Sequence, residues 1–157
     1  MESLRIEGSK TEQYQTLLSS FSTLIDPSLP NNINLLNLFA VFKEQFDFLW
    51  IGLYYVKEDQ LVLGPFQGPS ACSYIGYNKG VCGKSWAQKT PILVEDVDAF
   101  PGHIACSSDS KSEIVLPAFK NGEVALILDV DSDLLNDFDE IDHQYLGQLM
   151  SMIEKLL

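Results

Sequence analysis

The pair of apolar segments at residues 114–119 and 124–130 restricts the fold of this chain more than any other feature. Both segments favour strand structure, and Lys120-Asn121-Gly122-Glu123 joins them. Asn-Gly is typical of a type I′ turn, which connects two antiparallel strands. Pro117 cannot donate to a ladder of hydrogen bonds, so its strand must lie at a sheet edge there or carry a bulge. The sequence therefore predicts an antiparallel hairpin.

Elsewhere, apolar residues recur with helical or strand spacing, which divides the rest of the chain into elements. The first helix opens on the capping box Ser9-Lys10-Thr11-Glu12 and ends before Asp26-Pro27. The predicted helices cover residues 9–25, 30–46, 83–89 and the chain from 137 onward. The predicted strands cover residues 48–56, 61–66, 91–94, 114–119 and 124–130. Since no linker or repeat is visible, we expect one α+β domain over residues 1–157.

The charge balance excludes several classes of partner. Ten basic and 22 acidic residues give a formal net charge of −12. Phosphate backbones and anionic membranes would repel such a chain, so we expect neither nucleic acid nor membrane as a partner. The first residues lack an apolar signal segment, and no apolar run approaches the roughly 18 residues of a membrane span. We therefore expect a cytoplasmic protein that handles a small molecule.

All three cysteines, Cys72, Cys82 and Cys106, lie in the glycine-interrupted connections between strands. A single cysteine is most often a small buried hydrophobe, but three on adjacent loops favour redox chemistry. A reactive cysteine must become a thiolate, which a cation or a helix N-terminus assists. Cys82 precedes the helix predicted at Gly83, which favours it on electrostatic grounds, whereas Cys106 follows His103 by three residues. Local chemistry alone does not choose between them.

Other site types fit the sequence poorly. A zinc site of the three cysteines with His103 would lack any Cys-x2-Cys pair, so we disfavour it. The glycines match neither a phosphate-binding loop nor a dinucleotide fingerprint. His143 is expected on the surface of the last helix. The sequence thus predicts no metal and no cofactor.

Carboxylates near the ends of the hairpin strands form a second candidate group. Strand alternation places Asp129 and Asp131 on one face, although a solvated strand end would explain them equally well. A two-residue turn pairs Glu113 with Val130, which puts Glu113 on the opposite face. The three acids converge only if a bulge near Pro117 shifts the register, and we predict that bulge.

Aromatic residues on the strand at 48–56 supply a third group. Alternation places Trp50, Gly52 and Tyr54 on one face, where the glycine would leave a gap between two aromatic walls. The pattern alone favours a core strand, and the alternative is a pocket for an apolar or sulfur-containing group.

Taken together, these motifs resemble the free methionine-(R)-sulfoxide reductases, enzymes built on a GAF domain. The matching segments are Trp50-Ile-Gly-Leu-Tyr54, Gln67-Gly-Pro-Ser-Ala-Cys72, Gly80-Val-Cys-Gly83, Phe100-Pro-Gly-His-Ile-Ala-Cys106, Ser112-Glu-Ile-Val115 with Pro117, and Leu128-Asp-Val-Asp-Ser132. The resemblance covers nearly the whole chain. It implies a six-stranded, mainly antiparallel sheet with the N-terminal and C-terminal helices on one face and the catalytic loops on the other.

The resemblance also implies a chemistry. Cys106 would be the nucleophile that attacks the sulfoxide sulfur, which reverses the electrostatic preference for Cys82, and Cys106 would become a sulfenic acid. Cys72 would be the resolving thiol, and a thioredoxin-like reductant would reopen the resulting disulfide. Cys82 would be auxiliary.

The same resemblance distributes the substrate contacts. The acids Glu113, Asp129 and Asp131 would bind the ammonium of free methionine sulfoxide or deliver the proton. Trp50 and Tyr54 would enclose the S-methyl group, and amides of residues 80–82 would hold the carboxylate.

Some residues depart from the family pattern. Leu126, the segment Lys84-Ser85-Trp86 and Ser107 stand where other residues are common.

The family also implies a homodimer, formed through the terminal helices. The alternative function is a GAF module that senses a small ligand or the redox state without turnover.

Overall fold

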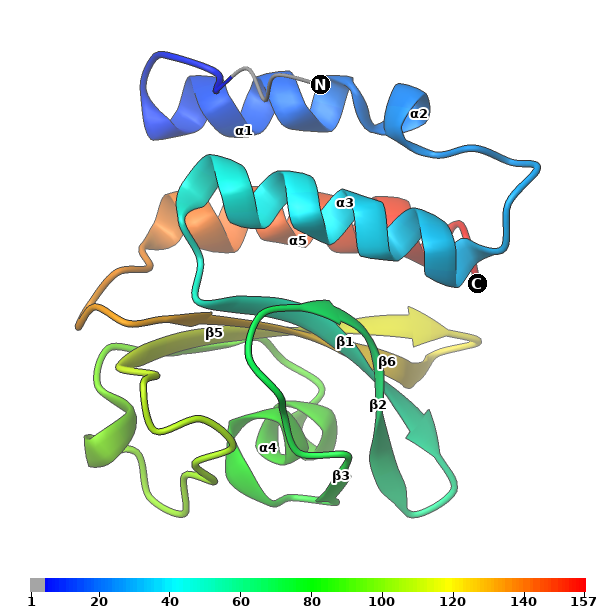
Figure 1. Cartoon of the computed structure of the whole chain (residues 1–157). Helices are drawn as coiled ribbons and strands as arrows, with labels where there is room; N and C mark the ends of the chain where they lie inside the picture. The colour runs from blue at the N-terminus through cyan, green and yellow to red at the C-terminus, as the bar shows by residue number, and fades with distance from the viewer. Residues whose placement is uncertain (1–4) are drawn as a thin grey trace.

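The computed structural model describes residues 5–157 and shows helical layers stacked on one sheet (Figure 1). The strand order is β3-β2-β1-β6-β5-β4, and every neighbouring pair is antiparallel, as predicted. The strands are β1 (Trp50–Lys57), β2 (Gln60–Gln67), β3 (Tyr74–Gly76), β4 (Ile92–Val94), β5 (Ser112–Lys120) and β6 (Glu123–Ser132). The helices are α1 (Lys10–Ser19), α2 (Phe21–Leu24), α3 (Asn31–Phe46), α4 (Gly80–Gln88) and α5 (Glu140–Glu154), with a 3₁₀ turn η1 (Val97–Ala99).

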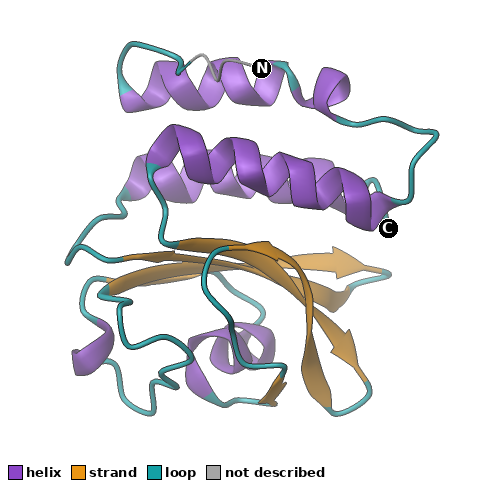
Figure 2. Cartoon of the chain, in the orientation of Figure 1, coloured by secondary structure: helices purple, strands orange, loops and turns teal. Residues whose placement is uncertain are grey.

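The two faces of the sheet are covered differently (Figure 2). Helices α3 and α5 pack on one face, and α1 with α2 forms an outer layer over them. The largest apolar cluster lies between these helices and inward-facing residues of the central strands, including Leu53, Leu116 and Leu128. Helix α4, strand β3 and the cysteine-bearing loops cover the other face, so the expected division of helices and loops is confirmed with α1 and α2 as an added outer layer. No helix within residues 5–157 is long and apolar enough to cross a membrane.

The first predicted helix is interrupted. Its capping box is present, with Ser9 and Glu12 bonding each other's backbone, but α1 ends at Ser19 and α2 begins at Phe21. The hydroxyls of Ser19 and Ser20 both donate to the Thr16 carbonyl, at 2.7 and 3.1 Å. Such side-chain bonds compete with the helical backbone ladder, which explains why one continuous helix was wrong here.

The hairpin carries the bulge that the sequence predicts. Asn121 and Gly122 have φ angles of 53° and 79°, as a type I′ turn requires. Phe119 pairs with Val124, but Ala118 pairs with Leu126, so Ala125 is the extra residue. The shift pairs Glu113 with Asp131. All three acids therefore share the face that lies away from α3 and α5.

Pro117 satisfies both conditions set by its missing N–H. It lies one residue from the bulge, and β4 pairs with β5 only at residues 113–115, which leaves β5 an edge strand at Pro117. Two other elements were not predicted: the short strand β3, which pairs with β2, and the turn η1.

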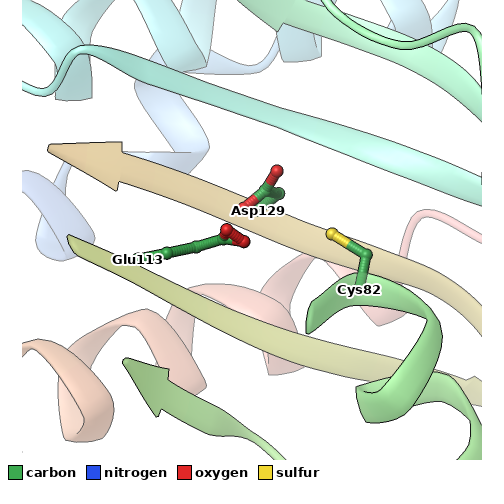
Figure 3. A group of neighbouring side chains, drawn as sticks. All are labelled: Cys82, Glu113 and Asp129. Atoms are coloured by element: carbon green, nitrogen blue, oxygen red, sulfur yellow. The ribbon is translucent and has the colours of Figure 1, made fainter. Parts of the chain in front are cut away.

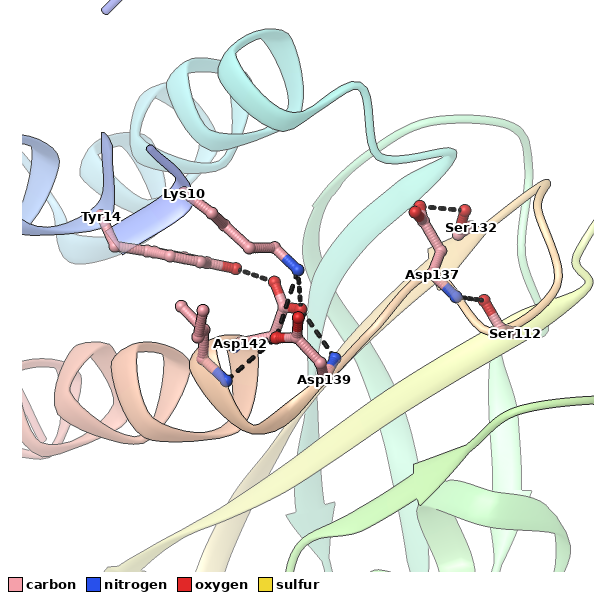
Figure 4. A network of polar contacts seen from close by, with 8 residues as sticks. Lys10, Tyr14, Ser112, Ser132, Asp137, Asp139 and Asp142 are labelled. Atoms are coloured by element: carbon pink, nitrogen blue, oxygen red, sulfur yellow. Dashed lines mark hydrogen bonds and ion pairs between the residues drawn. The ribbon is translucent and has the colours of Figure 1, made fainter. Parts of the chain in front are cut away.

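A buried polar network ties the outer helix α1 to α5 (Figure 4). Asp142 accepts a hydrogen bond from Tyr14 Oη at 2.6 Å and one from the Asp139 backbone at 2.9 Å, and it pairs with Lys10. Asp139 and Asp142 also form the capping box that opens α5. The network holds the helical layers together far from the cysteine loops.

Candidate active site

Adjacent positions on three strands bring the predicted acids and aromatics together. Asp131 on β6 lies between Trp50 on β1 and Glu113 on β5, and Asp129 lies opposite Gly52 on β1. Because side chains alternate along a strand, these residues point to the same face of the sheet. The register created by the bulge is therefore what assembles the acidic group.

A pocket opens over this part of the sheet, between α4 and the loop that carries Cys106. Its lining residues come from β1, β3, β5, β6, α4 and two loops: Trp50, Tyr54, Ser70, Ala71, Ile75, Gly80, Val81, Cys82, His103, Ile104, Cys106, Ser107, Ser110, Glu113, Asp129 and Asp131. Every predicted site residue except Cys72 lines it. Cys72 adjoins the pocket through its bond to Cys106.

Cys72 and Cys106 form a disulfide across the pocket rim, with their Cα atoms 5.3 Å apart. The two aromatic side chains of β1 hold the segment that carries Cys72. Trp50 Nε1 donates to the Pro69 carbonyl at 3.0 Å, and Tyr54 Oη donates to the Cys72 carbonyl at 2.9 Å. Trp50 and Tyr54 thus position a cysteine besides lining the pocket.

The gap predicted over Gly52 is filled. A Cβ atom at Gly52 would lie 2.4 Å from Phe66 Cβ and 2.7 Å from the Trp50 ring. The Trp50 and Tyr54 rings are stacked with centroids 6.0 Å apart, and Phe66 stacks on the other side of Trp50 at 5.2 Å. The glycine therefore lets the indole lie flat on the strand, and the open space is above the rings.

The three acids lie deep in the pocket. Glu113 and Asp129 are 5% and 8% exposed. Burial, together with the neighbouring carboxylates, raises the pKa of both side chains well above the ordinary values for Glu and Asp. Burial also raises the pKa of Asp131, to about 6, although Ser110 Oγ donates to its Oδ1 at 2.9 Å. Burial therefore favours the protonated form of each carboxyl in the unliganded pocket.

One oxygen of Glu113 and one oxygen of Asp129 have different surroundings. His103 Nε2 lies 4.0 Å from Glu113 Oε2, and burial lowers the pKa of the imidazole. Asp129 Oδ1 is buried without a hydrogen-bond partner among the described residues. A buried acceptor without a donor is costly, so this oxygen is a position that favours a ligand donor.

Cys82 is buried beside the acids, and the electrostatic preference for it was wrong. Helix α4 begins at Gly80, so Cys82 lies within its first turn and not ahead of it. Its side chain points toward Glu113 and Asp129 (Figure 3). Burial, and then the nearby carboxylates, raises the pKa of the Cys82 thiol well above its ordinary value. The surroundings thus oppose a thiolate, despite the helix N-terminus.

Comparison with known proteins places this geometry in a family. No family model matches the chain. GAF domain-containing protein A of Dictyostelium discoideum is 52% identical, covering 94% of each chain. The free methionine-R-sulfoxide reductase of Escherichia coli is 41% identical over 94% of this chain and 90% of its own. The chain belongs to the free methionine-R-sulfoxide reductase family.

A solved structure agrees with this membership of an oxidoreductase family. The free methionine-R-sulfoxide reductase of Neisseria meningitidis, in complex with its substrate, is 45% identical and superposes with a TM-score of 0.92. The match covers 97% of this chain and 92% of the other. The fold of this family member is that of a GAF domain, as the sequence resemblance implied.

Two pocket residues of this family member were not predicted as site residues. His103 was considered as a zinc ligand and as a neighbour of Cys106, and Ser110 was given no role. Ser110 is buried and bonds Asp131, which strand alternation cannot reveal because Ser110 is in a loop. The disfavoured zinc site of three cysteines is not what the structure holds, since Cys72 and Cys106 bind each other. His143 is partly exposed and pairs with Glu140, as expected for a surface residue.

Proposed function

We propose that this protein reduces free L-methionine-(R)-S-oxide to L-methionine, with Cys106 as the nucleophile and Cys72 as the resolving thiol. The observation that carries the proposal is the Cys72–Cys106 disulfide at the rim of a pocket with three acids beneath it, of which Glu113 and Asp129 are buried. The named relatives in Escherichia coli and Neisseria meningitidis support the choice of substrate.

The pocket offers complementary groups for each part of a free amino acid. The ammonium binds among Glu113, Asp129 and Asp131, where Asp129 Oδ1 needs a donor. The backbone N–H groups in the first turn of α4 receive the carboxylate, since a helix N-terminus favours an anion. The S-methyl group lies against Trp50. A methionine sulfoxide residue inside a peptide lacks both end charges and is excluded.

The reaction begins with reduced cysteines. The Cys106 thiolate attacks the sulfoxide sulfur while a protonated acid of the pocket donates to the sulfoxide oxygen. The sulfur–oxygen bond of the substrate breaks as the oxygen bonds to Cys106 Sγ, so methionine leaves and Cys106 becomes a sulfenic acid. The Cys72 thiol then attacks the Cys106 sulfur, which forms the disulfide and releases water. The sulfoxide gains two electrons, and the two thiols supply them.

A dithiol must then reopen the disulfide, and we assign this role to a thioredoxin-like protein. Attack on one sulfur gives a mixed disulfide, and the second thiol of the reductant resolves it. A reducing compartment such as the cytoplasm supplies this partner. Purified thioredoxin with its reductase and NADPH should support repeated turnover, whereas a protein that needs another donor would give one turnover only.

We also propose a homodimer, as the resemblance implies. Large apolar side chains remain exposed near the start of α3 and at the C-terminus, namely Leu29, Ile33 and Leu157. Asn31 donates to the Leu156 carbonyl, so these segments adjoin. Light scattering at micromolar concentration should give twice the chain mass, and a monomeric mass would contradict the assembly.

The activity is tested by incubating the protein with free L-methionine-(R)-S-oxide and dithiothreitol and measuring methionine by chromatography. The wild type should form methionine over many turnovers, and Cys106→Ser should lose at least about a thousandfold in kcat because no nucleophile remains. Ser108→Ala alters an exposed residue of the same loop and should retain activity.

A second substrate separates this function from general sulfoxide reduction and from ligand sensing. N-acetyl-L-methionine-(R)-S-oxide lacks the ammonium and should be a poor substrate. Equal rates for the two compounds would contradict the proposed contacts. A protein that binds the free sulfoxide but forms no methionine would be a sensor module.

A further inference from the structure

Three different side chains meet beneath the pocket in an arrangement that the proposed reaction does not fully use. Cys82 comes from α4, Glu113 from β5 and Asp129 from β6 (Figure 3). One Sγ or carboxylate oxygen from each lies within 4.8 Å of the others. All three side chains are buried. Two carboxylates suffice to bind an ammonium group, so the thiol beside them has no task in substrate binding.

One sulfur and two carboxylate oxygens form a donor set suited to zinc. Magnesium and calcium take oxygen ligands, whereas zinc combines thiolate sulfur with oxygen or nitrogen. Tetrahedral zinc, with bonds of about 2.0–2.3 Å, separates its ligand atoms by roughly 3.5 Å. The three ligand atoms lie within 4.8 Å of one another. Side-chain rotations that bring them about 1 Å closer together would allow all three to bond one zinc ion.

An unpartnered oxygen in the same cluster points independently to a cation or donor. Asp129 is 92% buried, as its exposed fraction of 8% implies, and its Oδ1 has no hydrogen-bond partner among the described residues. Within residues 5–157, the basic group that pairs with this cluster is His103, at 4.0 Å from Glu113. Two buried acids therefore share at most one distant positive charge, and a dication between them would neutralise both.

We propose that Cys82, Glu113 and Asp129 form a binding site for Zn²⁺ that excludes the substrate. On binding, the Cys82 thiol loses its proton to solvent and its sulfur bonds the metal, while each carboxylate contributes one oxygen. The cation takes two of the three carboxylates that the proposed function assigns to the substrate ammonium, so zinc competes with free methionine sulfoxide. The claim of competition rests on that proposed function, whereas the metal site does not.

Cobalt tests the site directly, because a thiolate bound to Co²⁺ gives a sulfur-to-metal charge-transfer band in the near ultraviolet. The full chain is used with its Cys72–Cys106 disulfide intact and without reductant. Cys82 is then the only free thiol of the three cysteines, so the band reports that residue alone. We expect one Co²⁺ per chain, the charge-transfer band, the strong visible bands of four-coordinate cobalt, and displacement by Zn²⁺.

Variants identify the ligands. Cys82→Ser should abolish the charge-transfer band, and Asp129→Asn should weaken cobalt binding at least about tenfold. Asp133→Asn makes the same change at an exposed position just after β6 and should bind like the wild type. Absence of the band in the wild type, or its persistence in Cys82→Ser, would overturn the site. Asp129→Asn provides a second test should Cys82→Ser fold poorly.

Competition is measured with the product as probe. Added L-methionine should raise the apparent dissociation constant of Co²⁺ more than glycine does at the same concentration, because both chelate free Co²⁺ but only methionine fits the pocket and places its ammonium on the same carboxylates. An effect of saturating methionine no larger than that of glycine would overturn the overlap of the two sites. The spectra are recorded on the disulfide form and require no turnover, so their result is independent of whether the protein reduces methionine sulfoxide.

Discussion

Two buried aspartates on opposite sides of the sheet have opposite surroundings. Asp142, 1% exposed at the start of α5, is bonded by Tyr14, by the Asp139 backbone and by Lys10 (Figure 4). Asp129, 8% exposed in the pocket, has an oxygen with no partner among the described residues. The helical side supplies every partner that its buried acid needs from its own chain. The pocket side leaves one acid for a ligand to satisfy.

The difference has an energetic meaning. A buried acceptor without a donor costs about 1–3 kcal/mol, so Asp129 lowers the stability of the free protein. Burial raises the pKa of both aspartates. At Asp142, hydrogen bonds from Lys10 and Tyr14 oppose that rise. At Asp129 the next largest cause, the Asp131 carboxylate, adds to it. The unpartnered Asp129 therefore lowers the stability of the free protein and leaves an oxygen for a ligand to bond, whereas Asp142 does neither.

The difference between Asp129 and Asp142 predicts that Asp129→Asn has the largest effect on activity. This substitution removes the charge and keeps the shape, so kcat/KM for free methionine-(R)-sulfoxide should fall at least about a hundredfold, the loss of a charged hydrogen bond in the complex. The free energy of unfolding should stay the same or rise, because a buried unpaired acid is gone. Steady-state kinetics and urea unfolding measure the two quantities. A clear loss of stability without loss of activity would reverse the assignment.

Asp142→Asn is the matched substitution on the helical side. It removes the negative charge opposite Lys10, whose side chain is 31% exposed and can turn partly toward water. We therefore expect a loss of about 2 kcal/mol in unfolding free energy, less than for a fully buried pair. Because the network lies on the other side of the sheet, kcat/KM of the folded variant should match the wild type at low temperature.

The helical side was also the easier one to predict from sequence. Helical periodicity, with the capping box at Ser9 for α1, identifies α1, α3 and α5, because each helix buries one apolar stripe. The contact between Lys10 and Asp142 was not predicted, because the residues lie 132 positions apart and only the packing of α1 on α5 joins them. Local patterns do not contain this information.

The pocket side was predicted in part. Strand alternation placed Asp129 and Asp131 together, and Pro117 indicated a bulge, but only the structure locates the extra residue at Ala125 and so aligns Glu113. The local rule for reactive cysteines misjudged Cys82, because a helix N-terminus can be buried under neighbouring acids. The family resemblance, and not local chemistry, favoured Cys106. The roles of individual site residues remain predictions.

The pH dependence of stability should separate the pocket side further. Burial raises the pKa of Asp131 from its ordinary 3.8 to about 6, so the folded protein holds this proton to higher pH than the unfolded chain does. The stability that the protonated Asp131 contributes is complete below pH 3.8 and is lost as the pH rises through about 6. An asparagine at position 131 does not titrate, so Asp131→Asn does not lose this contribution. The unfolding free energy of the variant should therefore rise relative to that of the wild type by up to about 3 kcal/mol between pH 4 and pH 7.

Urea unfolding of the disulfide form at pH 4, 5, 6 and 7 measures this gain. Asp133→Asn is the control, because that side chain is exposed to water two residues further along the chain. Its stability difference from the wild type should not change across the series. A gain for Asp131→Asn toward low pH would contradict the direction of the shift.

The smallest expected effect concerns two lysines, one on each side of the sheet. Lys84 Nζ donates to the Pro101 carbonyl at 2.9 Å and lies 4.8 Å from the centroid of the Phe100 ring, at the base of the loop that carries Cys106. Lys84 is also one of the departures from the family pattern. Once the disulfide is reduced, this contact remains to hold the loop over the pocket. Lys84 is therefore expected to position Cys106, whereas Lys10 stabilises the helical layers.

Lys84→Met should lower kcat/KM about three- to tenfold, through a loosened loop, and change the unfolding free energy by less than about 1 kcal/mol. The alkylation rate of reduced Cys106 should change with it, and Lys84→Arg should restore both values. Lys10→Met should do the reverse, lowering stability by about 1 kcal/mol with kcat/KM unchanged. If both lysine variants lose stability alike and keep full activity, the loop contact is only structural, and the functional difference between the two faces lies in the buried acids and thiols alone.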